Sequence, residues 1–187
     1  MDEVPPVRRA TFGEITLELV TGDIAAQPDL DAVVNAANAQ LRSGGGVAGA
    51  IHRAAGRALE DACAPLAPIE PGRCVVTDAF GLPNRAVLHC LGPVYGRDQP
   101  SAELLAGCYR EALALADAHR LRRVGFPALS TGAFGYPVRA AARVALAAVR
   151  GVAEALSDVE LVRFVLYSDD DRRIHAEVLE ELCAPDG

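Results

Sequence analysis

The fold is decided by residues 32–51, which read AVVNAANAQLRSGGGVAGAI. The stretch opens with Ala32-Val33-Val34, three apolar residues of the kind that form a strand buried on both faces of a sheet. It continues through Asn35 and Asn38 into the glycine run Gly44-Gly45-Gly46. From Val47 onward, apolar residues recur with helical spacing. A buried strand, a glycine-rich loop and a helix in this order indicate one unit of an α/β protein.

Strands and helices continue to alternate on both sides of this stretch. Further strands are predicted at Ile15–Val20, Ala86–Cys90, Arg123–Phe126 and Leu161–Tyr167. Helices are predicted at Val47–Cys63, Ser101–His119, Pro137–Leu156 and Asp171–Leu182. This order is typical of an α/β fold whose largely parallel sheet is covered on both faces. A length of 187 residues favours one domain.

Three loops carry the candidate chemistry, because ligands of such sheets bind at the carboxyl ends of the strands. Ser43–Gly46 and Ser130–Pro137 are small-residue loops that lead into helices, where free backbone N–H groups attract phosphate. Two such loops suggest a diphosphate. Asp23, in Thr21-Gly22-Asp23-Ile24, follows the first strand and could accept a hydrogen bond from an adenine amino group or a ribose hydroxyl. Each loop alone is also typical of an ordinary turn, so their shared position carries the hypothesis.

Composition removes several mechanisms. All 18 basic side chains are Arg, so neither Schiff-base chemistry nor a P-loop Lys is available. With 25 acidic residues the formal net charge is -7, which disfavours a broad surface for nucleic acid. No His, Cys and Asp cluster has the spacing of metal ligands, and we expect no metal and no cofactor.

The termini and cysteines predict a cytoplasmic protein. Residues 1–6, MDEVPP, are acidic and Pro-rich, unlike a secretory signal, and no apolar run is long enough to cross a membrane. The five Cys are an odd number without C-x-x-C spacing. They are therefore expected to be free buried thiols in a reducing compartment.

The combination of motifs resembles the macrodomain family, specifically its MacroD-type branch. The similarity spans roughly residues 13–183 and is carried in order by Thr21–Ile24, Val34–Asn38, Gly44–Gly56, Leu82-Pro83, Val87–His89, Leu91–Pro93 and Phe126–Pro137. The resemblance implies a three-layer α/β/α fold around a mixed, largely parallel sheet. It also implies an N-terminal extension over residues 1–12 and a single domain over residues 13–187.

The resemblance further implies that the protein binds ADP-ribose. Asp23 is expected to hold the adenine amino group, Ile24 to contact the ring and Asn38 to bond the distal ribose. The backbone of Gly45, Gly46 and Val47 would line one side of the diphosphate and distal ribose. The other side would be lined by Ser130, Thr131, Gly132, Ala133 and Phe134, with Phe134 beside the distal ribose. Tyr167 would either stack on adenine or pack on the last helix.

One departure bears on catalysis. MacroD-type hydrolases resemble this chain but carry Asp where Ala48 stands, and that carboxylate is thought to position or activate water; Ser43 also replaces a frequent Gly. His52 follows Ala48 by four residues and therefore shares its helix face. His52 is either a general base, with Asn38 orienting the ribose, or a residue that merely bonds nearby backbone.

Three functions remain open at this point. The protein hydrolyses the ester between the distal ribose and an acidic side chain of a mono-ADP-ribosylated protein, or hydrolyses O-acetyl-ADP-ribose, or is a non-catalytic ADP-ribose reader. The other histidines are expected to be bystanders: His89 structural in a buried strand, and His119 and His175 on the surface.

Overall fold

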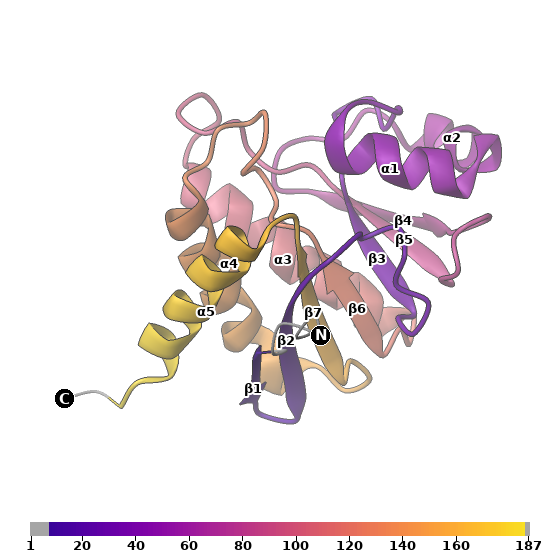
Figure 1. Cartoon of the computed structure of the whole chain (residues 1–187). Helices are drawn as coiled ribbons and strands as arrows, with labels where there is room; N and C mark the ends of the chain where they lie inside the picture. Colours follow the sequence, from indigo (N-terminus) through magenta and orange to yellow (C-terminus); the bar gives the residue numbers. More distant parts are fainter. Residues whose placement is uncertain (1–7, 186–187) are drawn as a thin grey trace, which may run out of the picture.

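A seven-stranded mixed sheet forms the centre of the computed structural model, which describes residues 8–185 (Figure 1). The strand order is β1-β2-β7-β6-β3-β5-β4. The five inner strands are parallel, and only the edge strands β1 and β4 run antiparallel to their neighbours. The strands are β1 Arg8–Phe12, β2 Ile15–Thr21, β3 Ala32–Ala36, β4 Cys74–Asp78, β5 Ala86–Cys90, β6 Arg123–Phe126 and β7 Leu161–Leu166.

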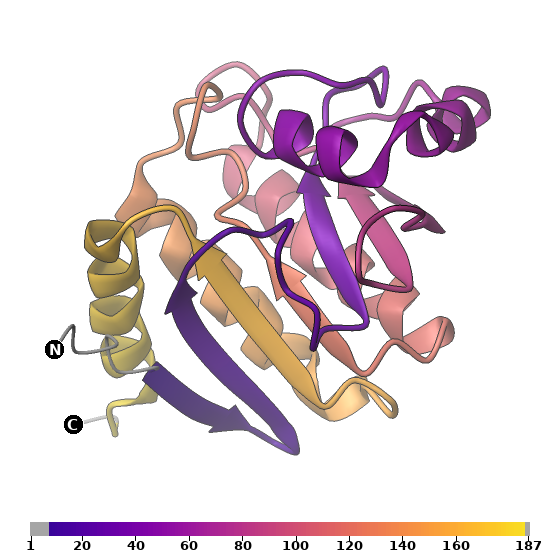
Figure 2. The same ribbon diagram turned by 45° about the vertical axis from the view of Figure 1, so that its right-hand side comes forward.

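Helices cover both faces of the sheet, which confirms the three-layer arrangement (Figures 1 and 2). On one face lie α3 Ser101–Ala118, α4 Val138–Val152 and α5 Asp169–Cys183. On the other face, α1 Gly46–Ala55 and α2 Arg57–Cys63 cover the β3, β5 and β4 side of the sheet. Short 3-10 turns follow α2 at Ala64–Leu66 and α4 at Ala153–Ala155.

The central strands are buried on both faces, as their continuous apolar runs predict. In β3, Val34 packs into the cluster under α3 and α4, while Val33 packs into the cluster under α1 and α2. Leu88 and Val87 of β5 divide between the two clusters in the same way. Because successive side chains of a strand point to opposite faces, a central strand needs apolar residues at nearly every position.

Two strands were not predicted. Arg8–Phe12, assigned above to an N-terminal extension, forms β1 and pairs with β2 from Arg8 opposite Leu19 to Phe12 opposite Ile15. That pairing stabilises an otherwise exposed segment. The second missed strand, β4, is also an edge strand and pairs only with β5.

The single helix predicted over Val47–Cys63 is two helices. Gly56 separates α1 from α2 with φ of 87°, a conformation that glycine adopts easily and that ends an α-helix. The helix predicted at Pro137–Leu156 likewise ends at Val152 and continues as a 3-10 turn. No helix in the described part of the chain is long and apolar enough to cross a membrane.

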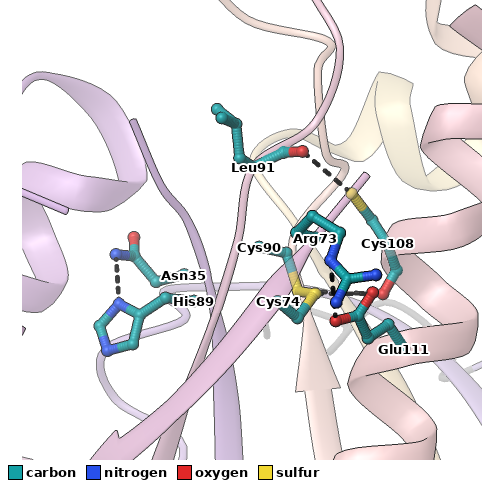
Figure 3. Close-up of a disulfide and its surroundings, with 8 residues drawn as sticks. All are labelled: Asn35, Arg73, Cys74, His89, Cys90, Leu91, Cys108 and Glu111. Atoms are coloured by element: carbon teal, nitrogen blue, oxygen red, sulfur yellow. Dashed lines mark hydrogen bonds and ion pairs between the residues drawn. A yellow bond between two sulfur atoms is a disulfide. The ribbon is translucent and has the colours of Figure 1, made fainter. Parts of the chain in front are cut away.

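The expectation of five free buried thiols is wrong. Cys74 and Cys90 lie directly opposite each other on antiparallel β4 and β5, with 4.2 Å between their Cα atoms, and form a disulfide (Figure 3). Facing residues of adjacent antiparallel strands come this close without distortion of the ladder. Because β4 was not predicted, there was no reason from the sequence to place Cys74 opposite Cys90. Cys63 and Cys108 are free and buried, whereas Cys183 is exposed.

The prediction that His175 lies on the surface is also wrong, because His175 is buried. It shares the inner face of α5 with Val178 and Leu179, and its ring centroid lies 5.9 Å from that of Phe164. Its Nδ1 lies 2.8 Å from the carbonyl oxygen of Asp171, one turn earlier, which satisfies that nitrogen inside the core. His119 is exposed, as predicted.

Candidate functional site

The candidate residues gather where the parallel strands end. The loops after β2, β3, β5, β6 and β7 all leave the same edge of the sheet, seen at the top of Figure 1. The amide of Gly22 donates to the carbonyl of Leu166 at 3.0 Å, which joins the loops after β2 and β7. The amide of Tyr95 donates to the carbonyl of Phe134 at 2.9 Å, which joins the loops after β5 and β6.

The glycine run presents the N-terminus of α1 to open space. Gly45 is the N-cap and provides no side-chain hydrogen bond to the first turn. A Cβ atom built on Gly45 or Gly46 would meet no other atom within 4 Å, and Gly46 has φ of +56°. The first-turn N–H groups and the positive end of the helix dipole therefore face an unobstructed space suited to an anion.

Gly49 explains why the run packs so closely on its own helix. A Cβ on Gly49 would lie 2.4 Å from the carbonyl oxygen of Gly44, so only glycine permits this approach. The close contact fixes where the loop turns into α1. The direction of the free N–H groups at Gly45 and Gly46 follows from that turn.

Asn38 organises the loop that precedes the glycine run. Its Nδ2 donates to the carbonyl of Arg42 at 2.8 Å, and its Oδ1 accepts from the Arg42 amide at 3.1 Å. The side chain therefore clamps one turn of the loop. One N–H of Nδ2 is left over for a ligand, since a primary amide has two donor hydrogens.

The loop after β6 contains a strained residue at its centre. Ser130 is buried, has φ of +66°, and its Oγ has no hydrogen-bond partner among the described residues. A Cβ on Gly92, in the loop after β5, would lie 2.2 Å from this Oγ. A residue with positive φ and a buried unpaired hydroxyl is costly in two ways, and such strain is concentrated at functional sites.

The remainder of this loop is partly open. The hydroxyl of Thr131 donates to the carbonyl of Ala128 at 2.8 Å, and the amide of Gly135 donates to the carbonyl of Gly132 at 3.0 Å. Gly132 and Ala133 are exposed at the tip. Phe134 is half-buried against the cluster under α1 and α2. The loop thus forms a second wall across the sheet edge from α1.

Asp23, Ile24 and Tyr167 lie together at the end of β2 and β7. Oδ1 of Asp23 accepts from the amide of Ala25 at 2.9 Å, while the side chain remains exposed. Ile24 is only 5% exposed, so most of its surface packs inward. Tyr167 is 95% exposed, so the alternative in which it packs on α5 is wrong and its ring is free to stack on a ligand.

Ala48 and His52 lie on the buried side of α1. Burial lowers the pKa of His52, against the opposing effect of Glu60, so the imidazole is neutral at pH 7. Its Nε2 is buried without a hydrogen-bond partner among the described residues. The alternative in which His52 serves only to bond nearby backbone is therefore not supported at Nε2, and a neutral imidazole retains the ability to accept a proton.

His89 has the structural role that was expected. It is fully buried, and burial lowers its pKa to about 4, with His52 adding to the effect. Nδ2 of Asn35 lies 3.1 Å from its Nδ1, and the Thr77 hydroxyl lies 2.9 Å from its Nε2. Since Nδ1 accepts from Asn35, Nε2 carries the hydrogen and donates to Thr77. This network was not predicted, although an Asn inside a buried strand indicates that a buried hydrogen-bond partner is present.

The described residues contain no group of three or more His, Cys, Asp or Glu side chains that could hold a metal ion. The site consists instead of backbone N–H groups, a few polar side chains and aromatic rings. Such a set recognises a molecule that carries phosphates, hydroxyls and a flat base.

Comparison with known proteins gives the same picture. The Macro domain family model matches residues 34–145. An O-acetyl-ADP-ribose deacetylase of Salmonella typhimurium is 45% identical over 170 residues, covering 88% of this chain and 94% of the relative. A macro domain-containing protein of Cupriavidus necator is 44% identical over 168 residues, covering 87% of this chain and 96% of the relative.

Solved structures agree as well. The Oceanobacillus iheyensis macrodomain with ADP has a TM-score of 0.90 and 39% identity, covering 95% of this chain and 96% of that one. The Trypanosoma brucei macrodomain in complex with ADP-ribose has a TM-score of 0.81 and 38% identity, covering 87% of this chain and 68% of that one. On the matched family model and these identities over most of its length, this chain belongs to the macrodomain family.

Proposed function

We propose that the protein binds ADP-ribose and hydrolyses the ester between its distal ribose and an acyl group. The acyl group is the acetyl of O-acetyl-ADP-ribose or an acidic side chain of a mono-ADP-ribosylated protein. One observation carries the proposal: the uncapped N-terminus of α1 at Gly45 and Gly46 faces open space at the strand ends, opposite the strained Ser130 loop. The named activities of the Salmonella relative and the ligands of the two solved macrodomains support it.

The ligand is expected to lie along the sheet edge. Asp23 and Tyr167 hold the adenine, which places the diphosphate between the first turn of α1 and the Ser130–Phe134 loop. Backbone N–H groups would neutralise the phosphates, with the unpaired hydroxyl of Ser130 as an additional donor. The distal ribose would then lie near Asn38, whose remaining Nδ2 hydrogen can orient a ribose hydroxyl.

The chemical step uses water and no covalent intermediate. No Lys exists in the chain to form one, and Ala48 provides no carboxylate. The neutral His52, one turn along α1 from Ala48, is the proposed base, and it takes a proton from water directly or through one further water. The water oxygen bonds the acyl carbon, the bond from that carbon to the ribose oxygen breaks, and the proton held by His52 passes to the ribose oxygen. The products are ADP-ribose and a carboxylic acid, which releases its proton to solvent.

A non-catalytic reader is the second candidate, favoured by the absence of an acid at Ala48. The two are distinguished by incubating the protein with O-acetyl-ADP-ribose and with a protein mono-ADP-ribosylated on glutamate. We expect release of ADP-ribose or acetate well above a protein-free control. Tight ADP-ribose binding without release would establish the reader instead. Membership of the MacroD-type branch, the cytoplasmic location and the lack of a nucleic-acid partner stay predictions.

A further inference from the structure

A cavity lies beside the proposed nucleotide site. Its volume is about 820 Å³, and it lies between the loop that follows Asn38 and the α1–α2 corner. Its lining residues are Gln40, Leu41, Arg42, Ser43, His52, Arg53, Gly56, Arg57, Glu60, Asp61, Ala64 and Ala67. None of the residues expected to hold ADP-ribose is among them. Of the residues proposed to act in catalysis, His52 alone is among these lining residues.

The charged side chains of this cavity form no ion pairs in the part of the chain that the structure describes. Within residues 8–185, Arg42, Arg53 and Arg57 form no ion pair, and neither do Glu60 and Asp61. Elsewhere Arg139 and Arg143 of α4 and Arg173 of α5 face carboxylates. Three unpaired guanidinium groups around one cavity are notable in a chain whose net charge is -7. They can bind carboxylates without first losing an internal ion pair.

The cavity is within reach of the proposed reaction. Ser43 lines it and directly precedes the glycine run, so the loop before α1 is a wall common to both spaces. From Gly46 at the start of α1 to His52 is six residues, which correspond to roughly 9 Å along a helix axis. Two or three residues of extended polypeptide span that distance. In Figure 2, α1 lies above the carboxyl end of β3, with α2 beside it.

We infer that this cavity binds the polypeptide on either side of the ADP-ribosylated residue, with carboxylates of that segment contacting Arg42, Arg53 and Arg57. The inference rests on the proposed function and specifies its substrate as a protein modified within an acidic segment. Glu60 and Asp61 lie on the α2 side of the same cavity and oppose a purely acidic ligand. They therefore select where along the segment its negative charges can lie.

Binding of short modified peptides tests the inference. One peptide carries ADP-ribose through a hydrolysis-resistant linkage between acidic residues, and a matched peptide has Asn and Gln in place of those acids. We expect the wild-type protein to bind the acidic peptide roughly tenfold more tightly than the neutral one, as two or three partly exposed ion pairs allow. The preference should decrease as salt is added. Equal affinity for both peptides would overturn the inference.

Variants locate the effect in the cavity. Arg42→Ala combined with Arg57→Ala should abolish the preference for the acidic peptide and leave the affinity for free ADP-ribose unchanged. The backbone of Arg42, which bonds Asn38, is retained in this variant. Glu60→Gln should strengthen binding of the acidic peptide. Arg85→Ala is the matched control, because Arg85 is an exposed arginine before β5, at the opposite end of the sheet.

The results separate this inference from the proposed function. If the double variant retains the acidic preference, the cavity does not bind the segment, whatever the enzyme hydrolyses. If neither O-acetyl-ADP-ribose nor the glutamate-modified protein is hydrolysed but the peptide preference depends on Arg42 and Arg57, the cavity is confirmed and the protein is a reader. If free ADP-ribose itself does not bind, both the proposed function and the inference are wrong.

Discussion

Replacing Ser130 by Ala should make the protein more stable and a weaker binder of ADP-ribose. The hydroxyl of Ser130 is buried and has no partner among the described residues, so the folded protein bears the cost of removing it from water. A buried unsatisfied polar group costs about 1–3 kcal/mol. Ala keeps the Cβ atom and the strained φ of +66°, so the variant changes the hydroxyl alone.

The magnitude follows from that single change. We expect the free energy of unfolding without ligand to rise by about 1 kcal/mol, which raises Tm by roughly 2–4 °C for a domain of this size. Binding should change in the opposite direction. A hydrogen bond to a charged group contributes about 1.5–3 kcal/mol, so loss of a Ser130 bond to a phosphate should raise Kd for ADP-ribose by roughly 10–100-fold.

Two measurements on the same samples check this. Denaturant unfolding without ligand gives the stability change, and calorimetric titration gives the Kd for ADP-ribose. Ser130→Gly serves as the companion variant, because it removes the hydroxyl and also relieves the positive φ. If Ser130→Ala binds ADP-ribose as tightly as the wild type, the hydroxyl does not face the diphosphate. If Ser130→Ala instead lowers stability, the hydroxyl is hydrogen-bonded in solution and bears no unmet desolvation cost.

Four further outcomes are expected. His52→Ala should lower hydrolysis of O-acetyl-ADP-ribose roughly 100-fold with unchanged ADP-ribose affinity, and an unchanged rate would remove His52 from the mechanism. Gly46→Val should abolish ADP-ribose binding, because Gly46 has φ of +56° and faces the ligand space, with circular dichroism as the check on folding. Burial lowers the pKa of His89 from 6.5 to about 4, so the unfolded chain binds a proton at this residue at a higher pH than the folded protein does. The contribution of neutral His89 to the unfolding free energy is therefore complete above pH 6.5 and is lost as the pH falls toward 4. Urea unfolding should show a loss of about 2 kcal/mol at pH 5. Reduction of the Cys74–Cys90 disulfide should lower the unfolding free energy by about 3 kcal/mol, and a Cys74→Ala variant should show no effect of reductant.

The parallel core was predictable because its strands bury both faces. A continuous run such as Ala32–Val34 or Ala86–Cys90 is compatible with few environments other than the middle of a covered sheet. Edge strands lack that constraint. In Arg8–Phe12 only Phe12 is buried, so its strand character depends on β2. The β-branched run Val75-Val76-Thr77 did contain a strand signal, and recognising it would have placed Cys74 opposite Cys90.

Only those parts of the site that depend on the local course of the backbone could be predicted from the sequence. Glycines before a helix indicate free N–H groups, whatever packs around them, so Gly45 and Gly46 could be assigned from the sequence. Side-chain roles depend on contacts between distant segments. Ser130 is unpaired because Gly92, in another loop, closes over it, and Asn38 is clamped because the chain turns back at Arg42. Neither relation has a local sequence signature.

The same distinction applies to the catalytic question. Composition alone excludes a lysine nucleophile, and residue identity alone excludes an acid at Ala48, so both negative statements came from the sequence. Support for His52 as the proposed base came only from the folded structure. A histidine on an apolar helix face is usually a satisfied core residue. Among residues 8–185, however, Nε2 of His52 is buried without a partner at the side of a cavity whose charged residues form no ion pairs. An unsatisfied neutral imidazole is costly to keep, and a water or a substrate group that bonds it in the working enzyme would offset that cost. Hydrolysis and substrate choice would then depend on the same segment, α1 and the loop before it.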